Sequence, residues 1–419
     1  MTKPIQAVRG MNDLLPEAAE RWRVIEQRMI AVLGAYGYRE TRLPIVEMTE
    51  LYQRSIGTAT DIVEKEMYSF EDRLNGEQLT LRPEGTASCV RAVIQHNLLY
   101  NAPQRLWYMG PMFRHERPQK GRYRQFHQVG VESLGYDGPD MDAEHIVMTA
   151  RLWKLLGLQD VALEINTLGS AEARTQYRKR LTTYFEQNAK LLDEDAKRRL
   201  HSNPLRILDS KNPAMQVMIE AAPRLADDLD QVSLQHFEQL QAMLRAAKVP
   251  FRINTRLVRG LDYYNATVFE WGTTRLGAQG TLCAGGRFDS LIEQIGGKPA
   301  PACGYAMGVE RLLALLQDQG FQPPAKTPHA YIVHVGELAD KIAFTVAEQL
   351  HDAGLGAVLH CGGGSFKSQM KKADASGARY AVIIGDDEAQ AGQASLKPLR
   401  DAGEQVRVNL NELVGRLHG

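Results

Sequence analysis

A proline-rich stretch near residue 325 most constrains how this chain of 419 residues can fold. Phe321–Pro328 contains three prolines. A proline has no backbone N–H and its ring fixes φ, so it interrupts a helix interior or a central strand. The stretch is therefore predicted to be a linker. We expect one domain over residues 1–325 and a second over residues 326–419.

The segment after the linker shows short apolar runs that alternate with helical patterns. Strands are expected at residues 331–335, 357–359 and 380–384, and helices at residues 339–353 and 366–376. A regular alternation of short apolar runs and helical patterns is typical of strands that are connected by helices. The second domain is therefore predicted to be a small α/β domain.

The segment before the linker mixes strand and helix patterns in a less regular order. Strands are expected at residues 106–110, 125–134, 161–167, 251–258 and 266–271, and helices at residues 16–37, 143–157 and 304–316. From about 170 to 250 the chain is instead charged, helical and poor in glycine. We interpret this part as a helical insertion in a β-rich domain.

Composition and motif spacing exclude several classes of protein. Fifty lysines and arginines balance fifty acidic residues, so any site for a polyanion must be a local patch. The four cysteines form no Cys-x-x-Cys pair and the histidines lack metal-ligand spacing, so no residue is assigned as a metal ligand. The N-terminus lacks the apolar core of a signal peptide, and no run is long enough to span a membrane. A reduced, cytosolic protein is expected.

Two strings suggest a site for a small polar ligand and a phosphate. They are Arg259-Gly260-Leu261-Asp262-Tyr263-Tyr264 and Gly285-Gly286-Arg287-Phe288-Asp289. An arginine carries a permanent charge and a rigid fork of donors that fits carboxylates and phosphates. Paired tyrosines form an aromatic wall with a hydroxyl at its tip. We interpret the glycines of the second string as a turn that a ligand could approach closely.

A basic loop lies between two of the expected strands. Residues 114–124 carry one acidic side chain, Glu116, and five basic ones: Arg114, Arg117, Lys120, Arg122 and Arg124. The loop could clamp a triphosphate and contact nucleic acid. A solvated hairpin explains the same composition equally well.

Polar side chains near this loop have two interpretations each. Gln128 and Glu132 fall on one face of an expected strand, which favours a site, although a water-exposed face of an antiparallel sheet shows the same pattern. Glu84 stands in a turn before a helix and could receive an ammonium group of a ligand. Thr86 follows it and could instead serve as the cap of that helix.

Two further features could bind phosphate. Arg311 stands one turn into an expected helix, from which it could reach a phosphate or simply lie on the surface. Gly362–Lys367 could cradle a phosphate, and with the basic residues that follow it could form a nucleic-acid surface. A flexible turn before a solvated helix explains the second segment equally well.

Taken in order along the chain, these strings resemble the class II aminoacyl-tRNA synthetases, and within them the bacterial histidyl-tRNA synthetases. Residues 38–47, 113–132 and 304–311 look like the three class motifs. LVRGLDYYNATVF (257–269) and AQGTLCAGGRFD (278–289) look like the two histidine-specific motifs. Phe288 departs from the tyrosine that is frequent in the family but leaves an aromatic in place. The resemblance extends over essentially the whole chain.

The resemblance implies an α+β catalytic domain, in which helices flank an antiparallel sheet, with a helical insertion and a C-terminal α/β anticodon-binding domain. It also implies ATP-dependent attachment of histidine to tRNA(His) through a histidyl-adenylate, with Mg²⁺, in a cytoplasmic homodimer. Arg114 would bind the α-phosphate, and Arg259 would bridge that phosphate and the histidine carboxylate. Arg122 and Arg311 would hold the outer phosphates.

The same resemblance assigns the histidine pocket. Its residues would be Glu84, Thr86 and Gln128 at the α-amino group, Glu132 and Tyr264 on either side of the imidazole, and Tyr263 in the wall. A neutral imidazole has one donor and one acceptor, which a carboxylate and a phenol satisfy together. A substrate without these groups would leave buried polar atoms unpaired, so discrimination of about 10⁴ or more can follow without editing.

Two rival interpretations share the implied fold. The first is a non-catalytic paralogue such as the regulatory subunit of the first enzyme of histidine biosynthesis. It should lack the C-terminal domain and have eroded motifs around Arg114 and Arg259, whereas this chain has both arginines and continues past the linker. The second is a nucleic-acid-binding accessory protein that has lost catalysis, which the intact arginines of the ATP site argue against.

Overall fold

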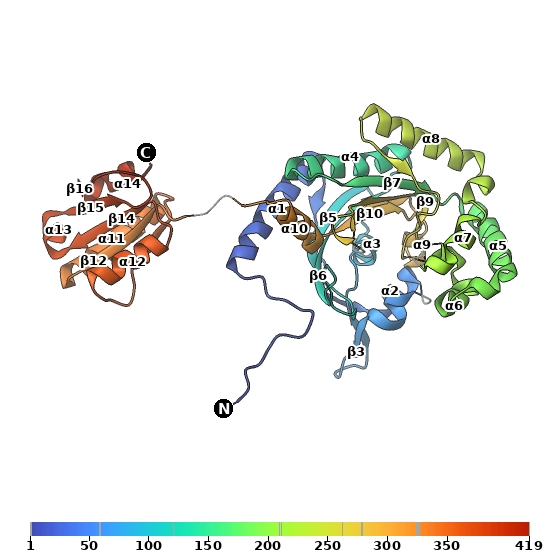
Figure 1. Cartoon of the computed structure of the whole chain (residues 1–419), viewed down its shortest axis with the longest axis horizontal. Helices are drawn as coiled ribbons and strands as arrows, with labels where there is room; N and C mark the ends of the chain where they lie inside the picture. The colour runs from blue at the N-terminus through green and yellow to red at the C-terminus, as the bar shows by residue number, and fades with distance from the viewer. Residues whose placement is uncertain are drawn as a thin grey trace. The chain divides into compact units, whose positions relative to one another are not determined.

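The computed structural model describes residues 2–57, 60–119, 121–208, 210, 212–261, 263–277, 280–323 and 327–418 (Figure 1). These residues form two compact units, Met1–Pro323 and Pro324–Gly419. Pro324–Lys326, the middle of the expected linker, lies outside the described residues. Each unit is described by itself below.

An eight-stranded sheet forms the centre of the first unit (Figure 1). In spatial order its strands are β1 (Arg39–Glu40), β5 (Gln104–Phe113), β6 (Gln125–Leu134), β11 (Ala302–Gly308), β10 (Thr281–Arg287), β9 (Asn265–Gly272), β7 (Ala162–Thr167) and β8 (Arg252–Ile253). The β1–β5 and β7–β8 pairs at the two edges are parallel, and the five pairs between them are antiparallel. The expected antiparallel sheet is confirmed.

Helices cover one face of this sheet through a continuous apolar core. They are α1 (Pro16–Ala35), α4 (Pro139–Leu156), α8 (Gln231–Ala246) and α10 (Val309–Asp318). In α1 the buried residues Trp22, Ile25, Met29 and Val32 recur at steps of three and four, which turns one stripe of the helix toward the sheet. Although α8 lies within the expected insertion of about 170–250, it packs along α4 on this face.

The other face of the sheet holds shorter helices and the helical module. The helices are α2 (Thr49–Ile56), α3 (Thr86–Gln95), α5 (Ala171–Gln187), α6 (Glu194–Ser202), α7 (Gln216–Glu220) and α9 (Leu291–Gln294). A π-helical turn, Ile62–Glu66, follows α2. A small antiparallel sheet of β2 (Val46–Met48), β4 (Gln78–Leu81) and β3 (Tyr68–Glu71) lies beside α2.

Three local expectations are wrong. Residues 304–308 belong to β11, and the helix begins only at Val309. Of residues 251–258, only Arg252–Ile253 form a strand. Gly285 and Gly286 lie in β10 rather than in a turn. A Cβ at either of these two glycines would lie 2.2 Å from a main-chain oxygen of a neighbouring strand, so both glycines are required for strand packing.

Arg287 forms a buried ion pair beneath the sheet. Its Nε lies 2.9 Å from Asp142 Oδ1, and its two terminal nitrogens donate to the carbonyls of Tyr136 and Gly138. Asp142 also accepts from His236 of α8 at 2.7 Å. Burial alone would raise the pKa of Asp142, but His236 and Arg287 lower it overall. Arg287 therefore joins β10, α4 and α8 and does not face a ligand.

The second unit is a five-stranded mixed sheet with helices. Its strands are, in spatial order, β13 (Ala357–Leu359), β12 (Ala330–Val335), β14 (Tyr380–Gly385), β15 (Gln393–Pro398) and β16 (Val406–Asn409), and its helices are α11 (Glu337–Asp352), α12 (Phe366–Ala375), α13 (Asp386–Ala391) and α14 (Leu413–His418). The predicted α/β domain is confirmed, although the antiparallel strands β15 and β16 were not anticipated.

The state of the cysteines and the character of the helices relate to the expectations drawn from composition. All four cysteines are free thiols, and Cys361 is the exposed one. Within the described ranges, the structure contains no helix with the length and apolarity that a membrane span requires.

Replacing Arg287 with Met should destabilise the first unit by about 3 to 5 kcal/mol, because the buried carboxylate of Asp142 loses a charged partner. All four tryptophans, Trp22, Trp107, Trp153 and Trp271, lie in that unit, so urea unfolding followed by tryptophan fluorescence reports on it alone. The control is Arg275→Met, which breaks exposed pairs with Asp160 and Asp318 and should cost at most about 1 kcal/mol. Equal losses in the two variants would contradict the assignment.

Candidate active site

A cavity of about 220 Å³ lies at one face of the eight-stranded sheet. Its walls come from the 114–126 hairpin, the start of α3, the 259–264 segment, and the ends of β6, β10 and β11. It gathers nine of the ten residues predicted from sequence: Glu84, Thr86, Arg114, Arg122, Gln128, Arg259, Tyr263, Tyr264 and Arg311. Glu132 alone does not line it. Lys120, Asp262, Ala278 and Gln279, which belong to the same motifs, lie outside the described residues.

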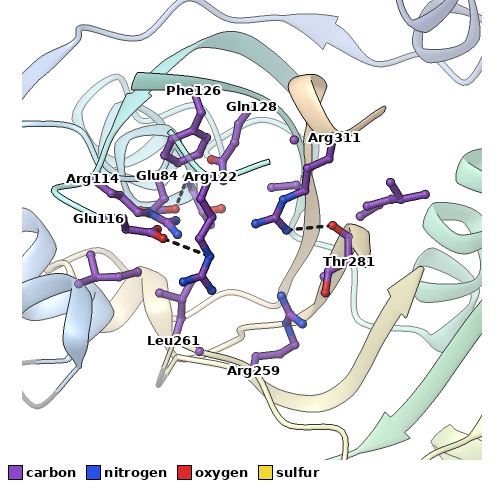
Figure 2. A pocket seen from close by; sticks show the side chains of 18 of the residues that line it. Glu84, Arg114, Glu116, Arg122, Phe126, Gln128, Arg259, Leu261, Thr281 and Arg311 are labelled. Carbon is purple, nitrogen blue, oxygen red and sulfur yellow. Dashed lines mark hydrogen bonds and ion pairs between the residues drawn. The ribbon is translucent and has the colours of Figure 1, made fainter. Parts of the chain in front are cut away.

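Two arginines of the cavity are held by main-chain carbonyls (Figure 2). Arg114 donates from Nε to the Pro83 oxygen at 2.9 Å, and its guanidinium lies 5.2 Å from the Phe126 ring centroid. Arg311 donates to the carbonyls of Gly121 and Thr281 at 3.1 and 2.9 Å. These carbonyl contacts fix the direction of both guanidinium groups at the cavity.

The other two arginines of the cavity pair with carboxylates. Arg122 lies 3.3 Å from Glu116, and Arg259 donates to Glu270 at 2.5 Å. Figure 2 shows Arg114, Arg122, Arg259 and Arg311 directed toward one space. Burial, followed by the charges of Arg122 and Arg114, lowers the pKa of Arg311. A bound polyanion would relieve this repulsion, so the cavity has the electrostatics of a phosphate site.

The sequence suggested Thr86 as the cap of this helix, but in the structure the Glu84 side chain caps it. The Glu84 carboxylate accepts from the backbone N–H groups of Thr86 at 2.7 Å and Ala87 at 3.0 Å, at the first turn of α3. The interpretation of Thr86 as the cap is wrong, because Thr86 is already the first helical residue. Burial raises the pKa of Glu84, and the two backbone donors partly oppose that rise.

One polar atom in the cavity wall needs a donor. Gln128 lies on β6 with its side chain at the cavity, and its Oε1 is buried with no hydrogen-bond partner among the described residues. A buried acceptor without a partner costs about 1 to 3 kcal/mol. Its position beside the Glu84 carboxylate in the wall suits a ligand that carries a positively charged donor.

Glu132 is fully buried beneath the cavity. Its Oε1 accepts from the hydroxyls of Thr86 at 2.8 Å and Tyr108 at 3.0 Å, whereas its Oε2 has no hydrogen-bond partner in the described part of the chain. Burial raises its pKa well above the usual range, and the two hydroxyls only partly oppose that rise. Glu132 is thus connected to the cavity through Thr86.

An aromatic wall closes the same end of the cavity. Tyr263 and Tyr264 have ring centroids 4.7 Å apart, and both pack edge-on against Phe288. Burial raises the pKa of Tyr264 to about 12, while the charge of Arg259 opposes the rise. Tyr264 therefore keeps its phenolic proton at neutral pH and can donate it in a hydrogen bond.

Sequence patterns missed three residues that organise the site. Tyr108 fills the space beside Gly85 and Gly130, where an added Cβ would lie 2.1 and 2.0 Å from its ring. Glu270 and Thr281 hold Arg259 and Arg311 from strands β9 and β10. The two glycines were the available signal for Tyr108. No pattern marked Glu270 or Thr281, because a single polar residue on a strand is common.

The basic hairpin has two distinct sides. Arg114 and Arg122 line the cavity, as the clamp interpretation requires. Arg117 does not line it, and Arg124 instead donates to the Glu116 carbonyl at 3.3 Å.

Across the ranges that the structure covers, no cluster of three or more His, Cys, Asp or Glu side chains could hold a metal ion.

Comparisons with known proteins match the chain over nearly its full length. A family model described as histidyl-tRNA synthetase matches residues 10–312, and one described as an anticodon binding domain matches residues 329–418. Histidine–tRNA ligases of Nitrosomonas europaea and Nitrosomonas eutropha are 67% and 65% identical, covering 98% and 99% of this chain and 98% of each relative. The apo histidyl-tRNA synthetase of S. aureus superposes with a TM-score of 0.84 at 34% identity, over 99% of this chain and 100% of that one.

Inorganic pyrophosphate should raise the melting temperature of the first unit, because it neutralises the arginines of the cavity. A ligand at one hundred times its Kd stabilises the folded state by about 2.7 kcal/mol. Arg311→Met should lose most of this shift, whereas the surface variant Arg275→Met should keep it. Thermal unfolding with and without pyrophosphate, followed by tryptophan fluorescence, measures both. An undiminished shift in Arg311→Met would rule out this binding mode.

Proposed function

The chain belongs to the histidyl-tRNA synthetase family, and from this premise we propose that its arginine-lined cavity is where histidine and ATP react. The protein attaches histidine to tRNA(His) at the expense of ATP, through a histidyl-adenylate. The observation that carries the assignment of the site is the joint presence, in one cavity, of four converging arginines and a buried polar wall.

The arginines act on the activation step. A carboxylate oxygen of histidine attacks the α-phosphorus, and the bond to the bridging oxygen breaks to release pyrophosphate. Both reactants are anionic, so their approach needs cations that are already in place. Arg114 would bind the α-phosphate, Arg259 would bridge it and the carboxylate, and Arg122 with Arg311 would hold the outer phosphates. The carbonyl anchors of Arg114 and Arg311 support these roles, because they fix the direction of each guanidinium.

The α-amino group of histidine would bind at Glu84, Thr86 and Gln128. An ammonium group has three donors. Gln128 Oε1 lacks a donor, and the Glu84 carboxylate keeps lone pairs beyond the two that α3 uses. Capping by Glu84 therefore supports its proposed role, since the helix fixes the carboxylate at the cavity.

The imidazole would lie between Glu132 and Tyr264, with Tyr263 in the wall. Glu132 Oε2 can accept from one ring nitrogen, and the Tyr264 hydroxyl can donate to the other. To reach Glu132 Oε2, the imidazole must pass Thr86, whose hydroxyl donates a hydrogen bond to Glu132 Oε1. A substrate without a ring N–H would leave Glu132 Oε2 unpaired, which is a source of specificity.

Mg²⁺ would enter with ATP rather than reside in the protein. Mg²⁺ commonly binds through substrate phosphates, waters and one or two carboxylates. The cavity fits this pattern, because the carboxylates of Glu116 and Glu310 line it, and Arg122 holds Glu116 at 3.3 Å. The ion would neutralise charge on the outer phosphates. Around it, Arg122 and Arg311 would hold the same phosphates in place.

The two units of the chain would have different functions. We assign catalysis to residues 1–325, with a helical insertion at about 170–250, and anticodon binding to residues 326–419. Support comes from the two compact units and from the match of residues 329–418 to the anticodon-binding family. Because its substrate is a tRNA used in protein synthesis, we also propose a cytoplasmic location.

We further propose a homodimer that uses residues 38–47 at its interface. The segment leads into β2, where Ile45, Val46 and Met48 are each 40 to 44% exposed. Three adjacent exposed apolar side chains are typical of an interface rather than of a solvated strand.

Histidine-dependent ATP–pyrophosphate exchange tests the proposed chemistry. With Mg²⁺ and each of the twenty amino acids in turn, only histidine should support exchange. Arg259→Ala should lower kcat by about a hundredfold or more, since it removes a preorganised charge at the transition state. The control Arg256→Ala, a half-exposed arginine of the same segment, should retain activity. Absence of exchange in folded protein would contradict the proposal and favour the regulatory paralogue.

Sedimentation velocity tests the dimer. The wild-type protein should sediment as two chains of 46.8 kDa. Val46→Asp should yield monomer, because it buries an unpaired charge in the interface. Phe344→Asp, at an exposed position of α11, should leave the dimer intact. A monomeric wild type at micromolar concentration would refute this interface.

A further inference from the structure

Glu270 connects two strands of the sheet to an arginine of the cavity. It lies on β9, its Oε2 accepts from Arg259 Nη1 at 2.5 Å, and its Oε1 accepts from the Thr281 hydroxyl at 2.7 Å. Because each oxygen has its own donor, the carboxylate is held in one orientation. Glu270 itself lies just outside the motifs described above, although both of its partners belong to them.

Thr281 extends this arrangement to a second arginine. Its hydroxyl donates to Glu270, while its carbonyl accepts from Arg311 Nη1 at 2.9 Å, the contact drawn in Figure 2. Thr281 opens β10 and therefore belongs to the sheet. One residue on a rigid strand thus sets the positions of both Arg259 and Arg311 relative to each other.

Arg259 needs such support because its own backbone is irregular. It belongs to the segment between β8 and β9, whose described residues form no helix or strand. Its Nε is buried without a hydrogen-bond partner among the described residues, and Glu270 is the carboxylate it pairs with. A guanidinium on a long side chain has many rotamers, so this ion pair supplies its direction.

Among the described residues, the ion pair of Glu270 is with Arg259. Its cross-strand neighbour on β7 is Glu164, a second carboxylate directly opposite. Glu164 has partners of its own, Arg252 and Asn254. The two carboxylates therefore form separate pairs on one sheet. Only the Glu270 pair reaches the arginine-lined cavity.

We propose that Glu270, oriented by Thr281, is a positioning residue that holds the Arg259 guanidinium against the reacting carboxylate and α-phosphate. This inference rests on the proposed role of Arg259 in the activation step. Glu270 itself touches neither reactant. It acts because a displacement of about 1 Å in a catalytic group can cost about a hundredfold in rate.

Glu270→Gln separates positioning from packing, because glutamine has nearly the same shape. Glutamine is neutral, so the ion pair with Arg259 becomes a weaker hydrogen bond to an uncharged oxygen, whereas the Thr281 hydroxyl can still pair by accepting from the amide NH₂. In histidine-dependent ATP–pyrophosphate exchange, kcat should fall about tenfold to a hundredfold. The KM values for histidine and ATP should change by at most about twofold, because the lost interaction acts in the transition state.

Glu164→Gln is the matched control. It makes the same change in a carboxylate–arginine pair on the neighbouring strand, outside the cavity, and should leave kcat and KM at wild-type values. A second pair of variants covers the case in which Glu270→Gln does not fold. Thr281→Val removes the hydroxyl and should lower kcat in the same way, while Thr281→Ser keeps the hydroxyl and should restore it.

A double-mutant cycle identifies the route of the effect. If Glu270 acts through Arg259, then Glu270→Gln should cause no further loss of kcat when Arg259 is already alanine. An equal loss in both backgrounds, or wild-type kcat in Glu270→Gln, would overturn the inference while leaving the role of Arg259 intact. Wild-type kcat in Arg259→Ala alone would overturn the proposed role of Arg259 and the inference with it.

Discussion

Mutual repulsion among arginines around one cavity is the constraint that the rest of this structure accommodates. Like charges that converge in a partly buried space oppose folding, and burial followed by the charges of Arg122 and Arg114 lowers the pKa of Arg311. The chain offsets the cost in two ways. Carbonyls of Pro83, Gly121 and Thr281 orient two of the arginines, and carboxylates pair with the other two. The residual charge is what a triphosphate would neutralise.

The sheet supplies the rigidity that such a cluster needs. Strands β9, β10 and β11 pack closely because glycines stand where a Cβ would collide with a neighbouring main chain. Arg287 of β10 also pairs with Asp142 of α4, which accepts a hydrogen bond from His236 of α8. With this scaffold fixed, side chains at the strand ends keep defined positions. The irregular segment that carries Arg259 can then be anchored to it by single contacts.

Structure and site residues could be predicted from the sequence where a local pattern marks them. The strand at Gln125–Leu134 and nine cavity residues could be predicted because periodicity and recognisable motifs mark them. Prediction failed where the decisive neighbour is distant in sequence. The buried pair of Arg287 with Asp142 was not predicted, and Glu84 rather than Thr86 caps α3. Neither outcome could be predicted from a local window, because each depends on how separate segments pack.

Buried polar atoms in the cavity wall and beneath it lack hydrogen-bond partners among the described residues, and these atoms explain why the site should be selective. Gln128 Oε1, Glu132 Oε2 and Arg259 Nε have no hydrogen-bond partner among the described residues. Each costs about 1 to 3 kcal/mol while unpaired. A ligand with an ammonium group, a ring N–H and a carboxylate can satisfy all three, whereas an analogue without one of these groups leaves a penalty in place. Selectivity would therefore come mainly from the pocket's unmet hydrogen bonds rather than from its shape alone.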